Sequence, residues 1–202
     1  MKRRGHRWKR HRLHGAWTFF RQWLRNPLRT AAVAPSGREL AAAMIAELPD
    51  DAQRVIELGG GTGAITRALL ARGIHGRDLL VVGLSEELHA HLHARFPQVR
   101  VARGDARDLP GIAMRCGFLR DGPVDAIVSG LGFLSMNYAE QQDMLRAAFA
   151  CLKPGAPFIQ FTYGARAPVL EEVARDLRLN VRKGAFVLRN VPPATVFVYR
   201  AT

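Results

Sequence analysis

Short apolar runs alternate with stretches of helical periodicity from residue 54 to the end of the chain. The apolar runs predict five strands and a closing hairpin around Pro192-Pro193, at residues 54–58, 79–84, 99–102, 124–129, 157–163, 186–188 and 195–199. The periodic stretches predict helices at residues 64–72, 86–95, 139–151 and 170–177. Strands that alternate with helices in this way predict an α/β fold with a doubly wound, parallel sheet.

A different apolar pattern occupies the N-terminal segment. Large apolar residues recur there at steps of four, three, four and four, at Leu13, Trp17, Phe20, Leu24 and Leu28. This spacing places them on one face of a helix and predicts an amphipathic helix between residues 8 and 28. Asn26-Pro27 is expected to end or kink that helix, because proline lacks the backbone donor and crowds the preceding turn.

The charge is concentrated in the same segment. The chain of 202 residues has a formal net charge of +13, and residues 1–30 hold ten Lys and Arg and no acid. The remaining 172 residues carry 20 basic and 17 acidic side chains. We therefore predict two parts, a basic arm at residues 1–30 and a near-neutral globular domain at residues 31–202.

Three interpretations of the arm are open. It can pack on the domain, follow a nucleic-acid backbone, or lie in an anionic lipid interface. Three Trp and two Phe between residues 8 and 24 exceed what phosphate contacts require and favour the membrane. The candidate membrane residues in the arm are Trp17, Phe20, Arg21, Trp23, Leu24 and Arg25.

Composition excludes several classes of protein. Two cysteines are too few for a disulfide framework and indicate a reducing, cytoplasmic compartment. No apolar run approaches the ~20 residues that a membrane-spanning helix needs. His89 and His93 share a helix face, but the sequence offers no evident third ligand, so we expect no metal site.

The segment Glu57-Leu58-Gly59-Gly60-Gly61-Thr62-Gly63 carries the clearest chemical signal. It ends a predicted strand and opens a predicted helix, so a ligand can approach its backbone closely. The spacing matches neither the dinucleotide-binding pattern nor a phosphate-binding P-loop. An acid just before the glycines suits a ligand with a positively charged amino group.

This loop resembles the cofactor-binding motif of class I S-adenosylmethionine-dependent methyltransferases. The resemblance continues at Gly104-Asp105-Ala106, which looks like the adenine site, and at residues 124–129 and 152–155, which look like the fourth strand and the turn before the fifth. It implies a Rossmann-like, mostly parallel seven-stranded sheet and S-adenosylmethionine as the cofactor, with S-adenosylhomocysteine as its product. The implied cofactor-binding residues are Glu57, Gly59, Gly61, Thr62, Gly63, Asp105, Ala106 and Ser129.

One position departs from that family pattern. The second strand of these enzymes normally ends in an acid that binds both ribose hydroxyls, and counting back from Arg95-Phe96-Pro97 places Gly83 there. We name Ser85 and Glu86, in the following turn, as candidate substitutes.

The chain is also similar to bacterial phospholipid N-methyltransferases from about residue 20 to residue 200. The similarity is carried by Asn26-Pro27, by Ala34-Pro35-Ser36, and by residues 129–131, 160–164 and 190–199. It implies stepwise methylation of phosphatidylethanolamine and its methylated intermediates towards phosphatidylcholine. It also implies a peripheral enzyme on the inner face of the cell membrane.

Given the reaction that this resemblance implies, the positions of four residues suggest roles for them, with a packed strand residue as the alternative for Tyr163 and a solvated helix residue for Arg38. Tyr163 and Ser129, near the ends of strands five and four, are the catalytic candidates. Ser36 and Arg38, just after the arm, are candidates for contact with the lipid phosphate.

Two further interpretations remain open. An rRNA adenine N6-methyltransferase would share the fold and cofactor, but residues 129–133 (Ser-Gly-Leu-Gly-Phe) lack the carboxamide and proline that hold the target base, which counts against nucleic acid. A non-catalytic membrane-binding protein on a methyltransferase fold is conceivable because of Gly83. No obligate protein partner is inferred.

Overall fold

A computed structural model of the chain describes residues 36–190 and 192–202. The amphipathic helix predicted between residues 8 and 28 lies outside these described residues. The same holds for the candidate membrane residues Trp17, Phe20, Arg21, Trp23, Leu24 and Arg25.

The described residues form one seven-stranded sheet with the strand order β3-β2-β1-β4-β5-β7-β6. The strands are β1 (Val55–Leu58), β2 (Leu79–Gly83), β3 (Arg100–Arg103), β4 (Ala126–Ser129), β5 (Phe158–Thr162), β6 (Leu179–Val187) and β7 (Ala194–Ala201). The strands β1 to β5 are parallel, and β7 pairs antiparallel with both β5 and β6. The predicted Rossmann-like, mostly parallel seven-stranded sheet is confirmed. We call the side where β1 to β5 end the carboxyl edge, and the opposite side the amino edge.

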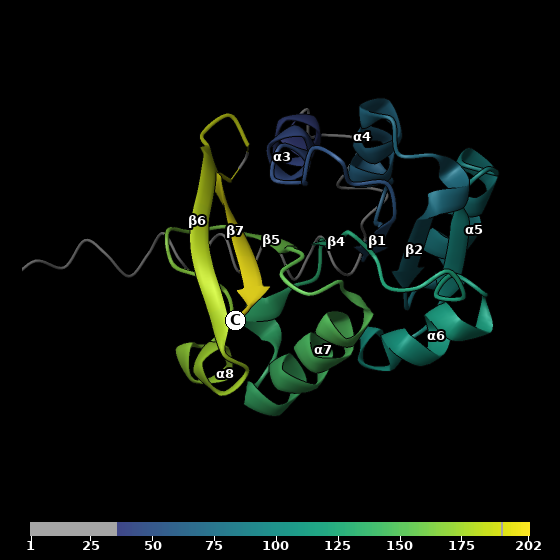
Figure 1. Cartoon of the computed structure of the whole chain (residues 1–202). Coiled ribbons are helices and arrows are strands. Elements are labelled where there is room, and N and C mark those ends of the chain that lie inside the picture. Colours follow the sequence, from purple (N-terminus) through teal and green to yellow (C-terminus); the bar gives the residue numbers. More distant parts are fainter. Residues whose placement is uncertain (1–35, 191) are drawn as a thin grey trace, which may run out of the picture.

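Helices cover both faces of this sheet (Figure 1). The helices α3 (Ser36–Ile45), α4 (Ala64–Arg72) and α5 (Glu86–Arg95) lie on one face, and α6 (Leu109–Arg115), α7 (Tyr138–Cys151) and α8 (Glu171–Asp176) lie on the other. Short 3-10 turns occupy η1 (Gly76–Asp78), η2 (Ala106–Asp108) and η3 (Phe133–Ser135). None of the helices in the described part of the chain has the length and hydropathy needed to cross a bilayer.

The central strands contribute side chains to two hydrophobic cores, one on each face of the sheet. Val55 packs in the core under α3, α4 and α5, whereas its neighbour Ile56 packs in the core under α6, α7 and α8. Because consecutive strand residues point to opposite faces, a strand covered on both sides is apolar at most positions. This explains why β1, β2 and β4 appear in the sequence as mainly apolar runs, with Glu57 as the exception within β1.

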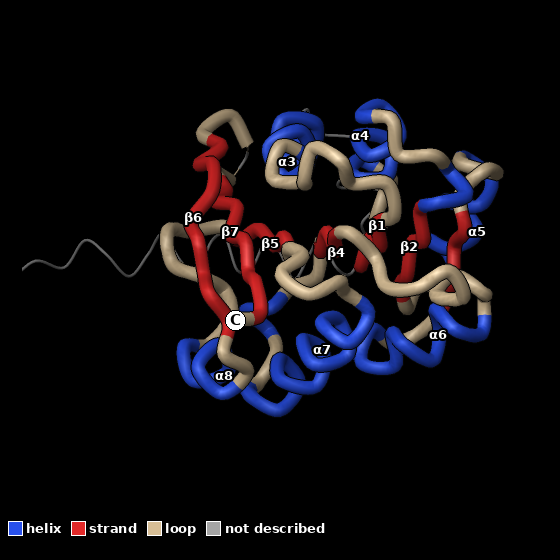
Figure 2. The backbone as a smooth tube through the Cα atoms, in the orientation of Figure 1, coloured by secondary structure: helices blue, strands red, loops and turns tan. Residues whose placement is uncertain are grey.

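Three elements differ from the sequence prediction, which defines no helix at residues 36–45 (α3) or 109–115 (α6) and has a shorter strand β6 (Figure 2). Strand β6 begins at Leu179 rather than at residue 186, and Leu188 lies in the turn that follows it. Residues 180–183 are exposed because β6 is the edge strand, so they carry no apolar pattern. Helix α6 was not predicted because Pro110 and Gly111 suggest a turn, although proline is well tolerated in the first turn of a helix.

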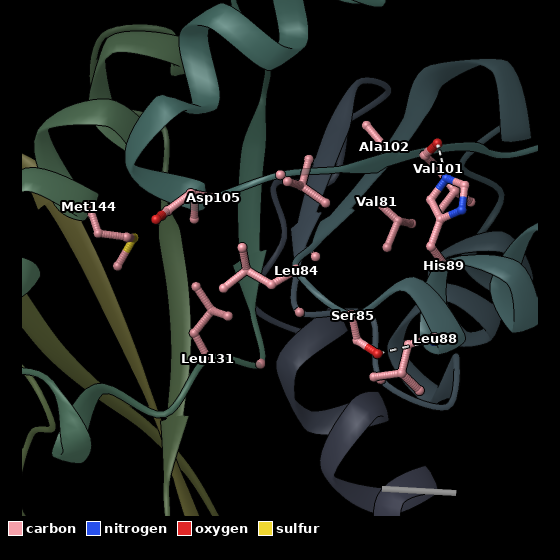
Figure 3. Close-up of a pocket in the computed structure, with 18 of the residues that line it drawn as sticks. Val81, Leu84, Ser85, Leu88, His89, Val101, Ala102, Asp105, Leu131 and Met144 are labelled. Carbon is pink, nitrogen blue, oxygen red and sulfur yellow. Dashed lines mark hydrogen bonds between the residues drawn. The ribbon is translucent and has the colours of Figure 1, made fainter. Parts of the chain in front are cut away.

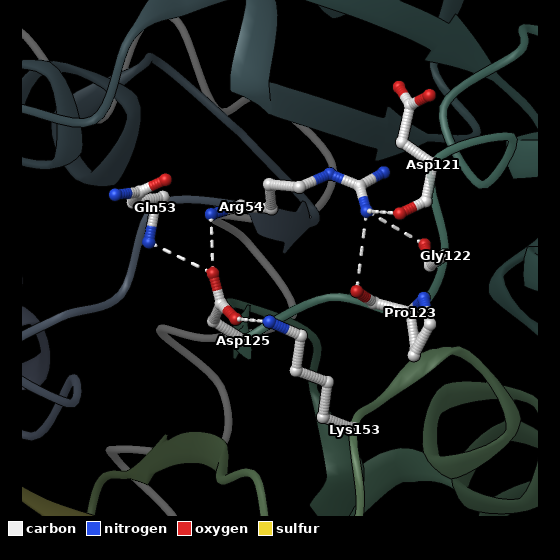
Figure 4. Close-up of polar contacts among 7 residues, drawn as sticks. All are labelled: Gln53, Arg54, Asp121, Gly122, Pro123, Asp125 and Lys153. Carbon is white, nitrogen blue, oxygen red and sulfur yellow. Dashed lines mark hydrogen bonds and ion pairs between the residues drawn. The ribbon is translucent and has the colours of Figure 1, made fainter.

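A polar cluster closes the amino edge between β1 and β4 (Figure 4). Asp125 accepts hydrogen bonds from the backbone N–H groups of Gln53 (2.9 Å) and Arg54 (2.8 Å) and pairs with Lys153 (2.5 Å). The Arg54 guanidinium in turn donates to the carbonyl oxygen of Gly122 at 2.8 Å. These contacts fix the starts of the two central strands, at the edge opposite the site described next.

Candidate cofactor-binding site

The glycine loop after β1 fits closely between β2 and β4. The N–H of Gly59 donates to the Val82 carbonyl oxygen and the N–H of Gly130 donates to the Leu58 carbonyl oxygen, both at 2.8 Å. Gly59 has a φ of 74°, in the left-handed region that favours glycine. A Cβ atom on Gly130 would lie 2.9 Å from the carbonyl oxygen of Gly59. The loops after β1 and β4 therefore approach each other so closely that only glycine fits at their crossing.

At Gly60 the same loop packs closely against β2 and α5. A Cβ atom at this position would lie 2.5 Å from Cγ1 of Val81 on β2 and 2.8 Å from Cδ1 of Leu92 on α5. The loop can therefore lie this close to β2 and α5 only with glycine at position 60.

Glu57 lies beneath this loop, fully buried. Its Oε2 atom accepts a 2.6 Å hydrogen bond from the hydroxyl of Thr66, whereas its Oε1 atom has no hydrogen-bond partner among the described residues. Burial raises the pKa of the Glu57 carboxyl from 4.5 to about 7, against the opposing effect of the hydrogen bonds from Thr66. A Cβ on Gly60 would lie 3.6 Å from Oε1, so the unpartnered oxygen is close to the loop. It fits a positively charged amino group, reached directly or through a water molecule.

A cavity of about 400 Å³ opens at the carboxyl edge between the ends of β1, β2, β3 and β4 (Figure 3). Its walls are mainly apolar, and its lining includes residues 59–61, 81–85, 101–102, 104–107 and 130–132. A volume of this size lies in the range of roughly 300–1,000 Å³ that is typical of small-molecule sites. Apolar walls with a few polar groups suit a flat aromatic ring such as adenine.

Asp105 and Ala106 line this cavity, directly after β3. The Asp105 carboxylate accepts from the Arg107 backbone N–H (2.9 Å), Nε (3.0 Å) and Nη2 (2.5 Å). The side-chain and backbone hydrogen bonds from Arg107 lower the pKa of Asp105. The carboxylate therefore stays ionised at neutral pH and remains an acceptor for an exocyclic amine.

The end of β2 presents no acid to the cavity. Gly83 is the last residue of β2 and lines the cavity, and a Cβ atom built on it would meet nothing within 4 Å. Ser85 also lines the cavity, but its hydroxyl oxygen caps α5 by accepting from the Leu88 N–H at 3.3 Å. Glu86 pairs with Arg103 at 2.9 Å and is not among the lining residues.

The remaining predicted residues do not line the cavity. Thr62 is half-buried and Gly63 is buried, and both lead into α4. Ser129 ends β4 fully buried, and its Oγ accepts from the Leu131 N–H at 3.3 Å. Tyr163 directly follows β5, its ring is 5.3 Å from that of Phe161, and burial raises the pKa of its hydroxyl.

The two residues proposed to contact lipid phosphate lie in the first turn of α3. Ser36 begins this helix, and Arg38 is exposed. A Cβ on Gly37 would lie 3.7 Å from that of Ala64, the first residue after the glycine loop. The start of α3 is therefore at the carboxyl edge.

The sequence analysis did not predict several of the residues that line the cavity. Met136, Glu140 and Met144 line the cavity from helix α7 and the segment before it, and His89 lines it from α5 with Nε2 3.2 Å from the Val101 carbonyl oxygen. Glu140 also completes the N-terminal capping box of α7 by accepting from the Asn137 N–H at 2.8 Å. Among the residues described, no group of three or more His, Cys, Asp and Glu is placed to hold a metal ion.

Comparison with known proteins identifies relatives along the chain. Residues 55–155 match the family described as "Methyltransferase domain". The chain is 29% identical over 188 residues to an ornithine lipid N-methyltransferase from Singulisphaera acidiphila, an alignment that covers 90% of this chain and 94% of that protein.

Solved structures share the fold. A TehB-like S-adenosylmethionine-dependent methyltransferase from Corynebacterium glutamicum superposes with a TM-score of 0.60 at 20% identity, covering 94% of this chain and 99% of that one. CalS10, an amino pentose methyltransferase from Micromonospora echinaspora with bound S-adenosylmethionine, gives a TM-score of 0.59 at 18% identity, covering 91% and 97%.

The family match includes both the glycine loop and Asp105. It confirms the cofactor predicted from the sequence, S-adenosylmethionine, which is also the molecule bound in CalS10. The residues present fit this group: the cavity is mainly apolar, Asp105 is ionised, and the unpartnered Glu57 oxygen lies beside the loop.

Proposed function

We propose that this chain, which belongs to the methyltransferase domain family, transfers methyl groups from S-adenosylmethionine to the amine of a membrane lipid. The observation that carries this proposal is the similarity to an ornithine lipid N-methyltransferase, which extends over nine-tenths of the chain. Within this class we propose phosphatidylethanolamine and its methylated intermediates as substrates, because the sequence resembles phospholipid N-methyltransferases. Ornithine lipid is the second candidate, since ethanolamine and ornithine both end in a primary amine.

The chain's own contribution to this reaction is binding and alignment. S-Adenosylmethionine supplies a methyl group that its sulfonium already activates. Asp105 is proposed to accept a hydrogen bond from the adenine amine, and the closely packed Gly59 and Gly130 would hold the backbone that borders the methionine part of the cofactor. Alignment of this kind can lower a barrier by several kcal/mol.

The lipid amine has to lose a proton before it can attack. Ser129 and Tyr163, at the carboxyl ends of β4 and β5, are proposed to face it. Because burial raises the pKa of Tyr163, its hydroxyl stays protonated near neutral pH and is not the base. Its proposed role is to present a hydroxyl and an aromatic face to the methylated ammonium group, while water carries the proton away.

The arm at residues 1–30 is proposed to bring the enzyme to an anionic membrane, at the inner face of the cell membrane. Ser36 and Arg38 would then meet the lipid phosphate close to the cavity. In this arrangement the arm binds the anionic membrane surface, and the domain catalyses the methyl transfer.

One parallel assay tests the proposal. Methyl-labelled S-adenosylmethionine is supplied with phosphatidylglycerol vesicles that contain phosphatidylethanolamine, with vesicles that contain ornithine lipid, or with ribosomal RNA. We expect label in phosphatidylethanolamine, and less of it when residues 1–25 are removed or when salt screens the surface charge. Label in ornithine lipid alone would retain the class and correct the substrate. Label in RNA alone would overturn the proposal. Absence of S-adenosylmethionine binding at physiological concentration would favour a non-catalytic protein.

A further inference from the structure

The turn between β6 and β7 lies at the same edge of the sheet as the cofactor cavity. Strand β7 runs antiparallel to β5, with Thr195 opposite Thr162 at the end of β5 and Tyr199 opposite Phe158 at its start. The turn that leads into β7 therefore lies at the carboxyl edge. In Figure 1 this turn reaches past β5 to the side of α3.

Helix α3, which begins at the first described residue, lies beside this turn. Arg189, in this turn, lies 3.8 Å from Glu39 near the start of α3, and α3 begins beside the glycine loop. Arg182, nearer the amino end of β6, pairs with Glu47 just after α3. The residues that follow the basic arm in sequence, the cavity and the β6–β7 turn therefore lie along one edge.

Large apolar side chains are exposed along this edge. The exposed fractions are 57% for Phe186 and 70% for Leu188, at the end of β6 and in the turn. They are 69% for Leu84, which follows β2 and lines the cavity, and 55% for Leu134, which follows β4. Large apolar side chains left exposed along one edge are typical of an interaction surface.

The charge of the C-terminal segment indicates the partner. Residues 183–194, which include the turn, hold two basic side chains, Lys183 and Arg189, and no acidic one. Lys183 and Arg189 are exposed on either side of Phe186 and Leu188. Apolar side chains flanked by basic ones are complementary to an anionic lipid surface, where the rings and methyl groups enter the interface and the cations meet phosphates.

We infer that the β6–β7 turn, through Phe186 and Leu188, is a second membrane contact that docks the carboxyl edge on an anionic bilayer. The cavity mouth then faces the headgroups, and the docking is additional to the attraction supplied by the arm. This inference rests on the proposed function, because it identifies the surface through which that function meets its substrate.

Vesicle binding by matched variants tests the inference. The double variant F186S/L188S is compared with M114S/V181S, which removes two apolar side chains that are also exposed, on α6 and at the amino end of β6. We expect F186S/L188S to bind phosphatidylglycerol vesicles about tenfold more weakly than the native chain, and M114S/V181S to bind equally well. Affinity for S-adenosylmethionine without vesicles should be unchanged in both. Equal vesicle binding by all three proteins, or an equal loss in both variants, would overturn the inference.

Hydrogen exchange on the unmodified chain provides a test that does not depend on a variant folding. Amides of residues 186–190 should exchange more slowly when phosphatidylglycerol vesicles are added, and less so with phosphatidylcholine vesicles. Unchanged exchange, or protection by single-stranded RNA in place of vesicles, would contradict membrane docking.

A soluble substrate separates this inference from the proposed function. A short-chain phosphatidylethanolamine below its micelle concentration reports the reaction without a bilayer. If it is methylated but F186S/L188S binds vesicles normally, the docking surface is wrong and the function stands. If vesicle binding depends on Phe186 and Leu188 but no lipid amine is methylated, the docking surface stands and the function is wrong.

Discussion

The hydroxyl of Thr66 donates a 2.6 Å hydrogen bond to Oε2 of Glu57, and so joins the helix after the glycine loop to the strand before it. Both side chains are fully buried. The bond spans the loop whose backbone borders the cavity, so it fixes the distance between the two ends of that loop. The acid of the glycine motif thus has a structural role in addition to any contact with the cofactor.

Replacing Thr66 with Val tests this connection. The variant keeps the shape of the side chain but removes the hydroxyl that donates to the buried Glu57 carboxyl group, which we expect to cost about 1–3 kcal/mol of stability. S-Adenosylmethionine affinity, measured by calorimetry, should fall as the loop loosens. Thr195→Val is the matched control, because Thr195 is equally buried and donates 2.6 Å to the Gly164 carbonyl oxygen. It should lose stability while its cofactor affinity stays close to native, and equal loss of affinity in both variants would count against the role of Thr66.

The buried Glu57 also predicts a pH dependence of stability. Its pKa is about 7 in the folded chain and 4.5 at its ordinary value. Between these values the Glu57 carboxyl group holds a proton in the folded protein and has released it in the unfolded chain. Its contribution to the free energy of unfolding is therefore complete below pH 4.5 and is lost as the pH rises to about 7. Glu57→Gln cannot ionise and avoids this loss. Relative to the native chain its stability should therefore rise between pH 4.5 and 7.5, by an amount on the order of 3 kcal/mol. Urea unfolding of both proteins without cofactor measures this difference, and parallel pH profiles would contradict the assignment.

The sequence predicted most of the sheet because its central strands are buried on both faces. Val55, Ile56, Glu57 and Leu58 are all buried, so β1 appears in the sequence as a compact run. The edge strand β6 could not be read in this way, because Asn180 and its neighbours face solvent and carry no apolar pattern. Burial, rather than strand propensity, decided which strands could be predicted.

The residues of the cofactor site likewise fall into those that the sequence could predict and those that it could not. The glycine loop and Asp105 could be predicted because each is a short motif at the end of a strand. Met136, Glu140 and Met144 could not be predicted, because their place at the cavity depends on how α7 packs against the neighbouring loops. No local spacing in the sequence encodes that packing.

Asp105 is expected to be essential for cofactor affinity. Asp105→Ala removes the ionised acceptor at the cavity wall together with the partner of Arg107, and should weaken S-adenosylmethionine binding by about tenfold or more. Asp108→Ala is the control, because Asp108 pairs with Arg115 at 2.8 Å and does not line the cavity. Calorimetry on the two variants checks the prediction, and similar affinities in both would remove Asp105 from the site.

A side chain at Gly61 should block the cofactor path. Gly61 has a φ of 49° and lines the cavity, so Gly61→Val introduces both backbone strain and bulk beside the ligand. Gly73→Val also imposes backbone strain, at a φ of 106°, but its side chain would meet open space at the end of α4. We expect both variants to be less stable and only Gly61→Val to lose cofactor binding. Normal binding by Gly61→Val would place the cofactor elsewhere.

The open position at Gly83 predicts a gain in affinity. Gly83 ends β2 at the cavity wall, a Cβ there meets nothing within 4 Å, and its φ lies outside the left-handed region. An aspartate can therefore enter without strain and supply the carboxylate that related enzymes direct at the ribose hydroxyls. A charge-assisted hydrogen bond contributes about 1.5–3 kcal/mol, so Gly83→Asp should bind S-adenosylmethionine about tenfold or more tightly than the native chain. Gly83→Ala fills the same space without an acceptor and should leave the affinity unchanged. If Gly83→Asp binds no better than Gly83→Ala, the ribose hydroxyls do not face position 83. The ribose would then be bound by another wall of the cavity.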